Sequence, residues 1–280
     1  MQVTNHRPTI AVVAIAKNEE IDIVGFLEHL LPWVDEIVIV DDGSTDNSVA
    51  ILEAAGNKVM IVSREMDKET GFSGQRNAGI DAAKSDWLIH MDIDERVTPE
   101  LADSILHKVQ DEDLNGLRYR RLNFFLHHPM RFGGWQNWNN PQVARRGHHR
   151  FRNRIHEVCE IEGGDGMIGQ LEGWMWHLND QDFVERVSKN LQYMQFSGQE
   201  ILDKGTKVRW YHLCLYPAYR ALRSYIFEGG FREGTRGLLF ALHTFSGTFN
   251  WYAWAWDRQN QIERSELEQQ LKSKWDEYGK

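Results

Sequence analysis

Residues 10–19 read I-A-V-V-A-I-A-K-N-E, an apolar run rich in β-branched side chains that ends in polar residues. A run of this length and composition predicts a buried strand. The next segment, from Glu19 to Leu31, places its apolar residues on one side of a helix. Residues 37–40, I-V-I-V, then predict a second strand. The order of strand, helix and strand is typical of a parallel sheet covered by helices.

The same alternation continues outward from this stretch to about residue 110. Strands and helices are expected in turn, with Thr45 or Asp46 capping the first of these helices: helix 45–56, strand 59–62, helix 75–84, strand 87–91, and a helix that opens at Thr98-Pro99. From Gly116 on, strand-like segments at 117–125 and 155–161 are separated by Gly, Asn and Arg clusters, and beyond Asp182 the sequence predicts helices. We therefore expect an α/β fold with a doubly wound, mostly parallel sheet and a helical C-terminal extension.

Composition and charge exclude several classes of protein. A chain of 280 residues can bury a full core. Its formal net charge of −9 argues against a general nucleic-acid binder, which needs a basic face. Two cysteines are too few for a disulfide framework and favour a reducing compartment. Residues 1–9 lack the apolar region of a signal peptide, and residues 237–256 are too polar for a membrane span, so we expect a soluble or membrane-peripheral protein.

Polar residues follow three of the predicted strands directly. They form the segments 16–19 (A-K-N-E), 41–46 (D-D-G-S-T-D) and 92–95 (D-I-D-E). In an open parallel sheet, ligands bind at the carboxyl ends of the strands. These three segments are therefore predicted to form one binding site.

The acidic pair Asp92 and Asp94 predicts a metal site. Two carboxylates separated by one residue at a strand end point to the same side, where they can share a divalent cation. Mg²⁺ and Mn²⁺ prefer oxygen ligands and are completed by substrate phosphates. The alternative is that both residues only cap or turn the chain. No glycine-rich phosphate loop follows the first strand and no Walker sequence is present, which favours a metal as the means of neutralising phosphate.

The series A-K-N-E-E, V-D-D-G-S-T-D, Q-R-N-A-G-I and D-I-D-E resembles glycosyltransferase family 2, whose members have the GT-A fold. Further segments are similar to the branch that adds sugars to the inner core of lipopolysaccharide: Asn123-Phe124-Phe125, Gly133-Gly134-Trp135, Arg154-Ile155-His156-Glu157 and 223–237. The resemblance covers about residues 9 to 258. It implies a GT-A catalytic domain at 1–181, with a nucleotide-sugar half (1–115) and an acceptor half (116–181), and a helical extension at 182–280.

The resemblance also assigns roles to single residues. The nucleoside would be held by Asn18, Glu19, Asp41 and Asp42, and the diphosphate or donor sugar would face Gln75, Arg76 and Asn77. Asp94 would ligate the metal directly, while Asp92 would contact the ribose or a metal-bound water. Inverting members of the family use a carboxylate as base on the acceptor hydroxyl, which points to Glu157, with His156 as the alternative. His177 is a candidate third metal ligand, and the alternative is a structural histidine.

The segment 204–256 combines positive charge with an apolar stripe. Between residues 204 and 236 there are seven Lys or Arg and two Glu. An apolar stripe follows at helical spacing: Leu238, Leu242, Phe245, Phe249, Tyr252 and Trp256. Core packing is one interpretation of the stripe, and an interfacial helix on an anionic membrane is the other.

The sequence thus predicts an inverting glycosyltransferase. It would use Mn²⁺ or Mg²⁺ to move a hexose from a nucleotide-diphosphate sugar, with UDP as the expected nucleotide, to a sugar hydroxyl of a glycolipid, lipopolysaccharide core or other cell-envelope glycan. We expect it in the cytoplasm, with peripheral contact to the inner face of the membrane through 204–256 as a further hypothesis, and no nucleic-acid partner. A sugar nucleotidyltransferase and a non-catalytic nucleotide-sugar-binding module are the alternatives. The oligomeric state is left open by the sequence.

Overall fold

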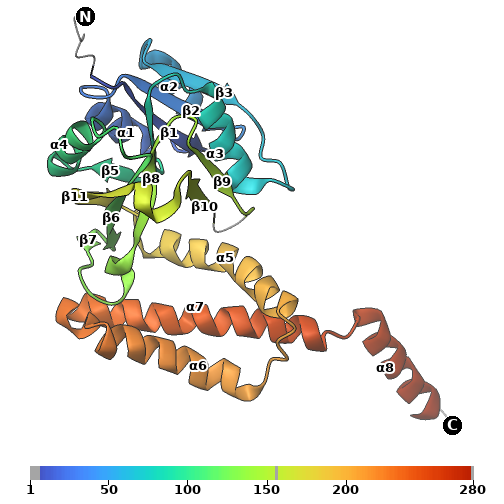
Figure 1. Ribbon diagram of the computed structural model, residues 1–280. Coiled ribbons are helices and arrows are strands. Elements are labelled where there is room, and N and C mark those ends of the chain that lie inside the picture. The colour runs from blue at the N-terminus through green and yellow to red at the C-terminus, as the bar shows by residue number, and fades with distance from the viewer. Residues whose placement is uncertain (1–6, 155–156, 279–280) are drawn as a thin grey trace, which may run out of the picture. The chain divides into compact units, whose positions relative to one another are not determined.

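The computed structural model describes residues 7–154 and 157–278 (Figure 1). The chain divides into two compact units. The first comprises Met1–Met130 and Trp135–Asn179 and is called the sheet unit below. The second comprises Arg131–Gly134 and Asp180–Lys280 and is called the helical unit. The short segment at residues 131–134 thus belongs with helices that begin only at Phe183.

The sheet unit alternates strands and helices in its first half and is rich in strands in its second. Its described elements are β1 (Ile10–Ala16), α1 (Ile23–Leu30), β2 (Glu36–Asp41), α2 (Ser48–Ala54), β3 (Val59–Ser63), α3 (Gly71–Ala82), β4 (Trp87–His90), β5 (Glu95–Val97), α4 (Pro99–Lys108), β6 (Gly116–Phe125), β7 (His128–Pro129), β8 (Asn139–Arg145), β9 (His149–Arg152), β10 (Val158–Ile161) and β11 (Ile168–His177). Single 3₁₀ turns lie at Trp135–Asn137 and Gly164–Met167.

One large sheet organises these elements, in the order β3-β2-β1-β4-β8-β6-β11-β5, with β7 paired to β6. The strands β3, β2, β1 and β4 are parallel to one another. Beyond β4 the sheet is mixed, because β8 runs antiparallel to both β4 and β6, and β5 runs antiparallel to β11. The α/β fold predicted from the sequence is confirmed, and the parallel order expected of the sheet holds in its N-terminal half.

The predicted strands and helices of the first half agree with the observed ones except for differences of up to about four residues at their ends. Helix α1 begins at Ile23 and not at Glu19, because Asn18 adopts a left-handed conformation with φ of 58° and a turn follows. Helix α2 begins after Asn47, one residue beyond the expected caps, and Asp46 still accepts a hydrogen bond from the Ser48 amide. The predicted cap of α4 is confirmed, since the Thr98 hydroxyl accepts from the Leu101 amide.

The core lies on both faces of the parallel strands. Along β1, Ile10, Val12 and Ala14 belong to one buried cluster, while Ala11 and Val13 belong to the other. A strand covered on both sides is apolar at every position, which explains the unbroken run in the sequence. Helix α3 packs so closely on this sheet that a Cβ at Gly79 would lie 2.4 Å from Val13 Cγ1.

The helical unit is built around its longest helix. Its elements are α5 (Phe183–Asp203), α6 (Trp210–Leu222), the π-helical segment η3 (Arg223–Phe227), the 3₁₀ segment η4 (Gly230–Glu233), α7 (Thr235–Asn260) and α8 (Arg264–Tyr278). Helix α7 packs against α5 near Gly198, whose added Cβ would lie 2.4 Å from Trp254 Cε3. On another side it packs against α6, where the His212 and Tyr252 rings stack 5.2 Å apart.

Two sequence expectations about the helical unit can be compared with the structure. Among the six residues of the predicted apolar stripe, Tyr252 packs against α6, while the other five are exposed. Core packing therefore accounts for only one member of the stripe. Across the described residues, no helix offers an apolar stretch long enough to span a bilayer.

Candidate active site

The polar segments predicted to form one site follow the carboxyl ends of β1, β2 and β4. Strands β1 and β2 are paired in register as far as Ala16 and Asp41, and β4 lies on the other side of β1. The segments after these strands are therefore neighbours in space. The loop after β4 contains Asp92 and Asp94 and leads directly into β5.

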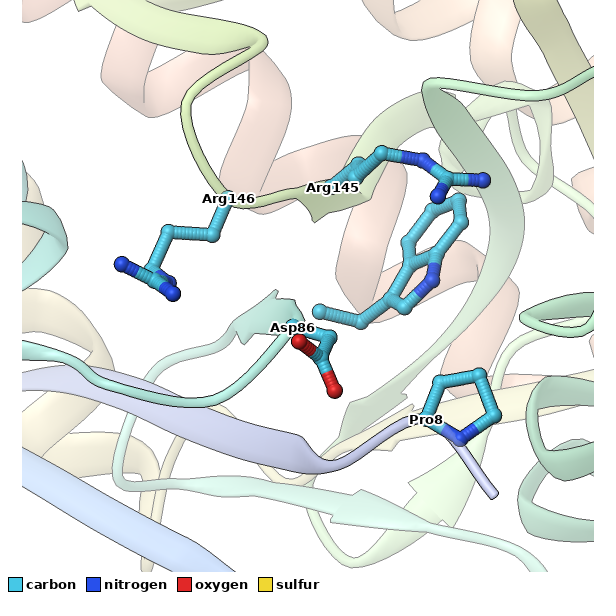
Figure 2. A pocket seen from close by; sticks show the side chains of 5 residues that line it. Pro8, Asp86, Arg145 and Arg146 are labelled. Carbon is cyan, nitrogen blue, oxygen red and sulfur yellow. The ribbon is translucent and has the colours of Figure 1, made fainter. Parts of the chain in front are cut away.

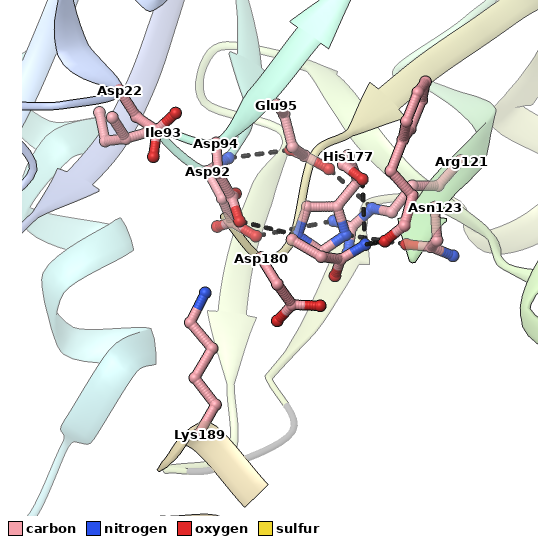
Figure 3. A network of polar contacts seen from close by, with 12 residues as sticks. Asp22, Asp92, Ile93, Asp94, Glu95, Arg121, Asn123, His177, Asp180 and Lys189 are labelled. Atoms are coloured by element: carbon pink, nitrogen blue, oxygen red, sulfur yellow. Dashed lines mark hydrogen bonds and ion pairs between the residues drawn. The ribbon is translucent and has the colours of Figure 1, made fainter. Parts of the chain in front are cut away.

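Asp92, Asp94 and His177 form the one group among the described residues with the make-up and spacing of a metal site. Their ligand atoms all lie within 4.8 Å of one another (Figure 3). His177 reaches the pair because β11 runs antiparallel to β5, with His177 opposite Glu95. The Leu178 amide then donates to the Asp94 carbonyl at 3.0 Å. The two carboxylates offer the oxygen ligands that Mn²⁺ and Mg²⁺ prefer, and the imidazole adds one nitrogen ligand.

Asn123 fixes the orientation of the His177 ring. Its Nδ2 donates to the Trp135 carbonyl at 3.1 Å, which turns its Oδ1 toward His177 Nδ1 at 2.8 Å. Because Oδ1 can only accept, Nδ1 carries a proton and Nε2 faces Asp94 Oδ2, 3.2 Å away. Burial lowers the pKa of His177, but the bonded Asp94 outweighs it and raises the pKa. A metal-binding histidine is usually oriented by a hydrogen bond from its far nitrogen, and the Asn123 oxygen accepts such a bond here.

Two arginines surround Asp92. Arg76 donates to its Oδ1 at 2.8 Å. Arg121 lies 3.7 Å from its Oδ2 (Figure 3). Burial acts to raise the pKa of Asp92, but the two guanidinium groups hold this pKa below its usual range. Asp92 is therefore ionised at neutral pH, as a metal ligand must be.

Glu95 is fully buried beneath the acidic pair. Its Oε2 accepts a hydrogen bond from the Asp92 amide at 2.8 Å, and its Oε1 lies 2.7 Å from Arg121 Nε. Burial raises the pKa of Glu95 to about 7, with Asp92 adding to this effect and Arg121 opposing it. Glu95 thus fixes the backbone of the loop that carries the candidate ligands.

Glu157, the predicted base, lies on the other side of Arg76. Arg76 Nε donates to Glu157 Oε1 at 3.0 Å, while the same guanidinium bonds Asp92. The structure therefore brings the predicted base within one side chain of the acidic pair. His156, the alternative base, lies outside the described residues.

The residues predicted to hold the nucleoside tie together the loops after β1 and β2. The Thr45 amide donates to Asn18 Oδ1 at 2.7 Å, and the Glu19 amide donates to Ser48 Oγ at 2.7 Å. Asp41 accepts from the amides of the turn that follows it, and Asp42 forms an ion pair with Lys17 at 2.9 Å. These four predicted residues therefore line one region of the sheet edge.

Gln75 and Asn77 make well-defined bonds inside the protein. The buried Gln75 amide donates to the Arg64 carbonyl at 2.7 Å and accepts from the Arg64 side chain at 2.6 Å. Asn77 bonds both the amide and the carbonyl of Phe151, at 3.0 and 2.9 Å. Asn77 thus holds β9 against α3, and of the three residues predicted to face the donor only Arg76 contacts the acidic pair.

Comparison with known proteins identifies the family. The family model described as "Glycosyl transferase family 2" matches residues 11–159. The chain belongs to this family. It is therefore a glycosyltransferase, and the predicted enzyme class and GT-A type of α/β fold are confirmed. The nucleotidyltransferase and the non-catalytic module left open by the sequence are not supported.

Relatives and solved structures give the range of the similarity. The lipopolysaccharide core biosynthesis glycosyltransferase LpsC of Rhizobium meliloti is 25% identical over 74% of this chain and 77% of its own length. The glycosyltransferase GlyG of Streptococcus pneumoniae is 33% identical over 73% of this chain and 65% of its own length. Among solved structures, S. aureus TarS 1–349 covers 91% of this chain and 93% of its own, with 14% identity and a TM-score of 0.45. Glucosyl-3-phosphoglycerate synthase from Mycobacterium tuberculosis, in complex with Mn²⁺ and UDP-glucose, covers 68% and 77%, with 18% identity and a TM-score of 0.43.

Sequence reasoning assigned no role to three residues that hold the candidate metal site in place: Arg121, Asn123 and Glu95. A signal for two of them was present. Arg121 and Asn123 lie on the same face of β6 as the fully buried Leu117, because they alternate with it. A charged residue on the core face of a predicted strand must have a buried partner, here Glu95. Arg121 also stacks on Trp138, with 4.1 Å from its guanidinium carbon to the ring centre.

A separate cavity of about 440 Å³ lies at the opposite ends of the same strands (Figure 2). It is lined by Pro8 ahead of β1, Asp86 and Trp87 at the start of β4, and Arg145 and Arg146 at the end of β8. Arg145 Nε donates to the Leu114 carbonyl, and Asp86 accepts from the Thr9 amide and hydroxyl. These contacts join neighbouring chain segments at this end of the strands.

Proposed function

We propose that this family 2 enzyme is an inverting hexosyltransferase. It moves a hexose from a nucleotide-diphosphate sugar, with UDP as the nucleotide, to a hydroxyl of an acceptor glycan. The observation that supports this most is the position of Arg76, which bonds Asp92 of the acidic group and Glu157 at the same time. Transfer with inversion requires charge stabilisation at the leaving diphosphate and a base at the acceptor, and these two functions fall to groups joined by one guanidinium.

The acidic group would hold the divalent cation, Mn²⁺ or Mg²⁺. Asp94 and Asp92 supply carboxylate oxygens, and Asn123 keeps the Nε2 atom of His177 toward them. A bound cation supplies neutralisation of the charge that develops on the leaving diphosphate. Arg121 and Glu95 hold the Asp92 side chain and backbone in place, which keeps the site ready before the donor arrives.

The donor nucleoside would lie over the ends of β1 and β2. Asp41 and Asp42 are carboxylates at that edge that can accept from a uracil N–H or from ribose hydroxyls, with Asn18 and Glu19 in the adjoining loop. Arg76 would contact the diphosphate. Gln75 and Asn77 act on the donor through the position of α3, which they fix by their bonds to Arg64 and Phe151.

Glu157 would accept the proton of the acceptor hydroxyl as this oxygen attacks the anomeric carbon. The bond to the leaving diphosphate breaks on the opposite side of that carbon, which inverts its configuration. Arg76 pairs with Glu157 in the free enzyme, so the negative charge of a bound diphosphate competes for the same guanidinium. Binding of the donor would thereby release the base. His156 is the alternative base.

The acceptor would be a sugar hydroxyl of a glycolipid, of lipopolysaccharide core or of another cell-envelope glycan. The likeness to LpsC supports the lipopolysaccharide core. Such an acceptor is built on a lipid, so the enzyme would work in the cytoplasm at the inner face of the membrane, with contact through residues 204–256. In the domain assignment, residues 1–181 would form the catalytic domain and residues 182–280 the extension that faces the membrane or the acceptor.

The reaction can be tested by release of UDP from UDP-hexoses, with and without acceptor glycan and with and without EDTA. Asp94→Asn should lower the rate by about a thousandfold or more, because a direct ligand is lost. Glu157→Gln should lower transfer by about a hundredfold or more while donor binding persists. Asp257→Asn, an exposed acid of α7, is the matched control and should retain full activity. Full activity of Asp94→Asn, or of the wild type in EDTA, would refute the metal role.

A further inference from the structure

Helix α6 and the adjoining η3 segment present an apolar face to solvent. Five of its residues recur at spacings of 4, 4, 3 and 4 and are each at least 38% exposed: Tyr211, Leu215, Tyr219, Leu222 and Ile226. This set is called the α6 face below. Trp210 and Phe227, at the two ends of the segment, are 69% and 76% exposed. Exposed apolar residues usually occur singly, and a continuous face of this kind marks an interaction site.

The opposite side of α6 packs against other residues of the helical unit. The exposed face is therefore not the side of α6 that contributes to the core of this unit. His212 stacks on Tyr252 of α7, and the Arg220 guanidinium lies 5.2 Å from the centre of the Trp251 ring. Pro217 is buried, and the Ser224 hydroxyl donates to the Gly133 carbonyl at 2.9 Å. These contacts fix the rotation of the helix and hold the α6 face outward.

The segment that contains the α6 face carries an excess of positive charge. Residues 204–236 contain seven Lys or Arg and two Glu, an excess of five in a chain whose net charge is −9. Lys207 and Arg209, directly ahead of α6, are exposed, and no carboxylate within the described part of the chain pairs with them. An anionic surface would therefore be attracted to this region and repelled by most of the remaining protein.

Tryptophan and tyrosine indicate what kind of surface is bound. Tyr211, Tyr219 and Trp210 have an apolar ring and a polar atom, and such side chains are enriched where hydrocarbon meets water. A helix with aromatic and aliphatic residues on one face and Lys or Arg beside it lies in the plane of a bilayer interface. The chemistry of the α6 face thus matches a lipid surface with negative head groups.

Helix α8 shows that exposed apolar residues alone do not lead to this conclusion. Its stripe of Leu267, Leu271, Trp275 and Tyr278 is as exposed as the α6 face. The charges differ, because α8 contains four acidic and three basic residues. Electrostatic attraction to an anionic bilayer is therefore expected for α6 and absent for α8.

We infer that the α6 face inserts into the interface of an anionic lipid bilayer, with the helix parallel to the membrane plane. Leu215, Tyr219 and Leu222 enter the boundary of the acyl chains, while Lys207 and Arg209 contact phosphate groups. This inference rests on the membrane contact proposed above and narrows it from residues 204–256 to α6. It does not depend on which sugar is transferred.

The test uses the full chain and sedimentation with vesicles. Wild-type protein should bind vesicles of phosphatidylethanolamine and phosphatidylglycerol about tenfold more tightly, or better, than phosphatidylcholine vesicles. Leu215→Glu with Leu222→Glu should weaken the anionic binding by about a hundredfold, because each buried leucine contributes roughly a factor of ten. Lys207→Gln with Arg209→Gln should weaken it by about fivefold for each charge removed.

The matched control is Leu267→Glu with Leu271→Glu on α8. This variant replaces the same residue type as the α6 variant, at comparable exposure, and adds the same charge. Because α8 is not the proposed membrane contact, its binding to anionic vesicles should equal that of the wild type. If the glutamates on α6 lower the melting temperature, Leu215→Gln with Leu222→Gln replaces them. UDP release with a water-soluble acceptor should be unchanged in both pairs, which separates this inference from the proposed reaction.

Four results would overturn the inference. The α6 variant could bind anionic vesicles as the wild type does, or the α8 variant could lose binding equally. Alternatively, sedimentation velocity could show a wild-type dimer that the α6 variant converts to a monomer, which would assign the face to a second copy of the chain. A wild type that binds neither kind of vesicle would also refute the broader membrane contact, without affecting the transfer reaction.

Discussion

The sheet unit and the helical unit of this glycosyltransferase use apolar side chains in opposite ways. Of the 43 buried apolar residues among those described, 39 lie in the sheet unit. Of the 30 large apolar side chains that are exposed, 25 lie in the helical unit, although that unit is the smaller one. The sheet unit is stabilised by its own core, whereas the helical unit has apolar surface that remains available for a partner.

The two units also differ in where their charges lie. In the sheet unit, the largely buried Arg76 and Arg121 pair with the half-buried Asp92 and the buried Glu95 and form a network around the candidate metal site. In the helical unit, several ion pairs lie at the surface between neighbouring helical turns, such as Lys189 with Glu185. Buried charges must be paired with good geometry, while surface pairs contribute little. The sheet unit is thus built for a fixed site, and the helical unit for contact with another surface.

Truncating one leucine in each unit gives the largest expected contrast. Leu88 of β4 is fully buried, and Leu242 of α7 is 57% exposed. Leu88→Ala should lower the free energy of unfolding by about 2–5 kcal/mol, because it removes buried contacts and leaves a cavity. Leu242→Ala should change it by less than about 0.5 kcal/mol. Urea unfolding followed by circular dichroism measures both, and equal losses would contradict the comparison.

Adding one methyl group in each unit tests how firmly the neighbours are held. A Cβ at Gly79 would lie 2.4 Å from Val13 Cγ1, and a Cβ at Gly198 would lie 2.4 Å from Trp254 Cε3. Gly79→Ala should lower the free energy of unfolding by about 1–3 kcal/mol, because Val13 is enclosed between strands. Gly198→Ala should cost about 1 kcal/mol or less, since the partly exposed Trp254 ring can shift. Tryptophan fluorescence should change in Gly198→Ala. A larger loss of unfolding free energy in Gly198→Ala than in Gly79→Ala would show that the helical unit holds its side chains more firmly than the sheet unit.

Acid should weaken both units through a histidine in each. Burial lowers the pKa of His29 and of His243 to about 4, from an ordinary value near 6.5. The folded state therefore binds fewer protons than the unfolded state between these values. Stability is complete above pH 6.5 and falls as the pH drops toward 4, by roughly 1–2 kcal/mol for each histidine.

Substitution by glutamine separates the two contributions. In the sheet unit, neutral His29 accepts a hydrogen bond from the Val97 amide through Nε2. His29→Gln should therefore remove the part of the pH dependence of unfolding that comes from this histidine. In the helical unit, His243 Nε2 lies 3.2 Å from Arg186 Nε. His243→Gln should reduce the pH dependence of unfolding by a similar amount. Melting temperatures measured from pH 7 to pH 4 give both slopes. An unchanged slope in either variant would show that its histidine titrates normally.

The fold of the first hundred residues could be predicted because its strands are apolar along their whole length. Strands β1, β2 and β4 are recognised from their composition alone. Strand β8 could not be recognised, because it reads N-N-P-Q-V-A-R and only Val143 and Ala144 are buried. Its pairing with β6 shifts register next to Pro141, which has no amide to donate. Strand β5, with three residues, is too short to give a pattern.

The sequence by itself determined the acidic pair and the loops that accompany it, because Asp92, Asp94, Asp41 and Asn18 directly follow recognisable strands. Only the tertiary structure decided what surrounds the pair. His177 follows Asp94 by 83 positions and reaches it through the pairing of β11 with β5, and Arg121 and Asn123 come from β6. The tertiary structure also decided which side of α6 faces solvent. The sequence shows which residues of a helix are apolar, but the neighbouring helices determine which of these residues are buried. Local patterns fix a strand and its end, but partners distant in the chain are chosen by pairing and packing.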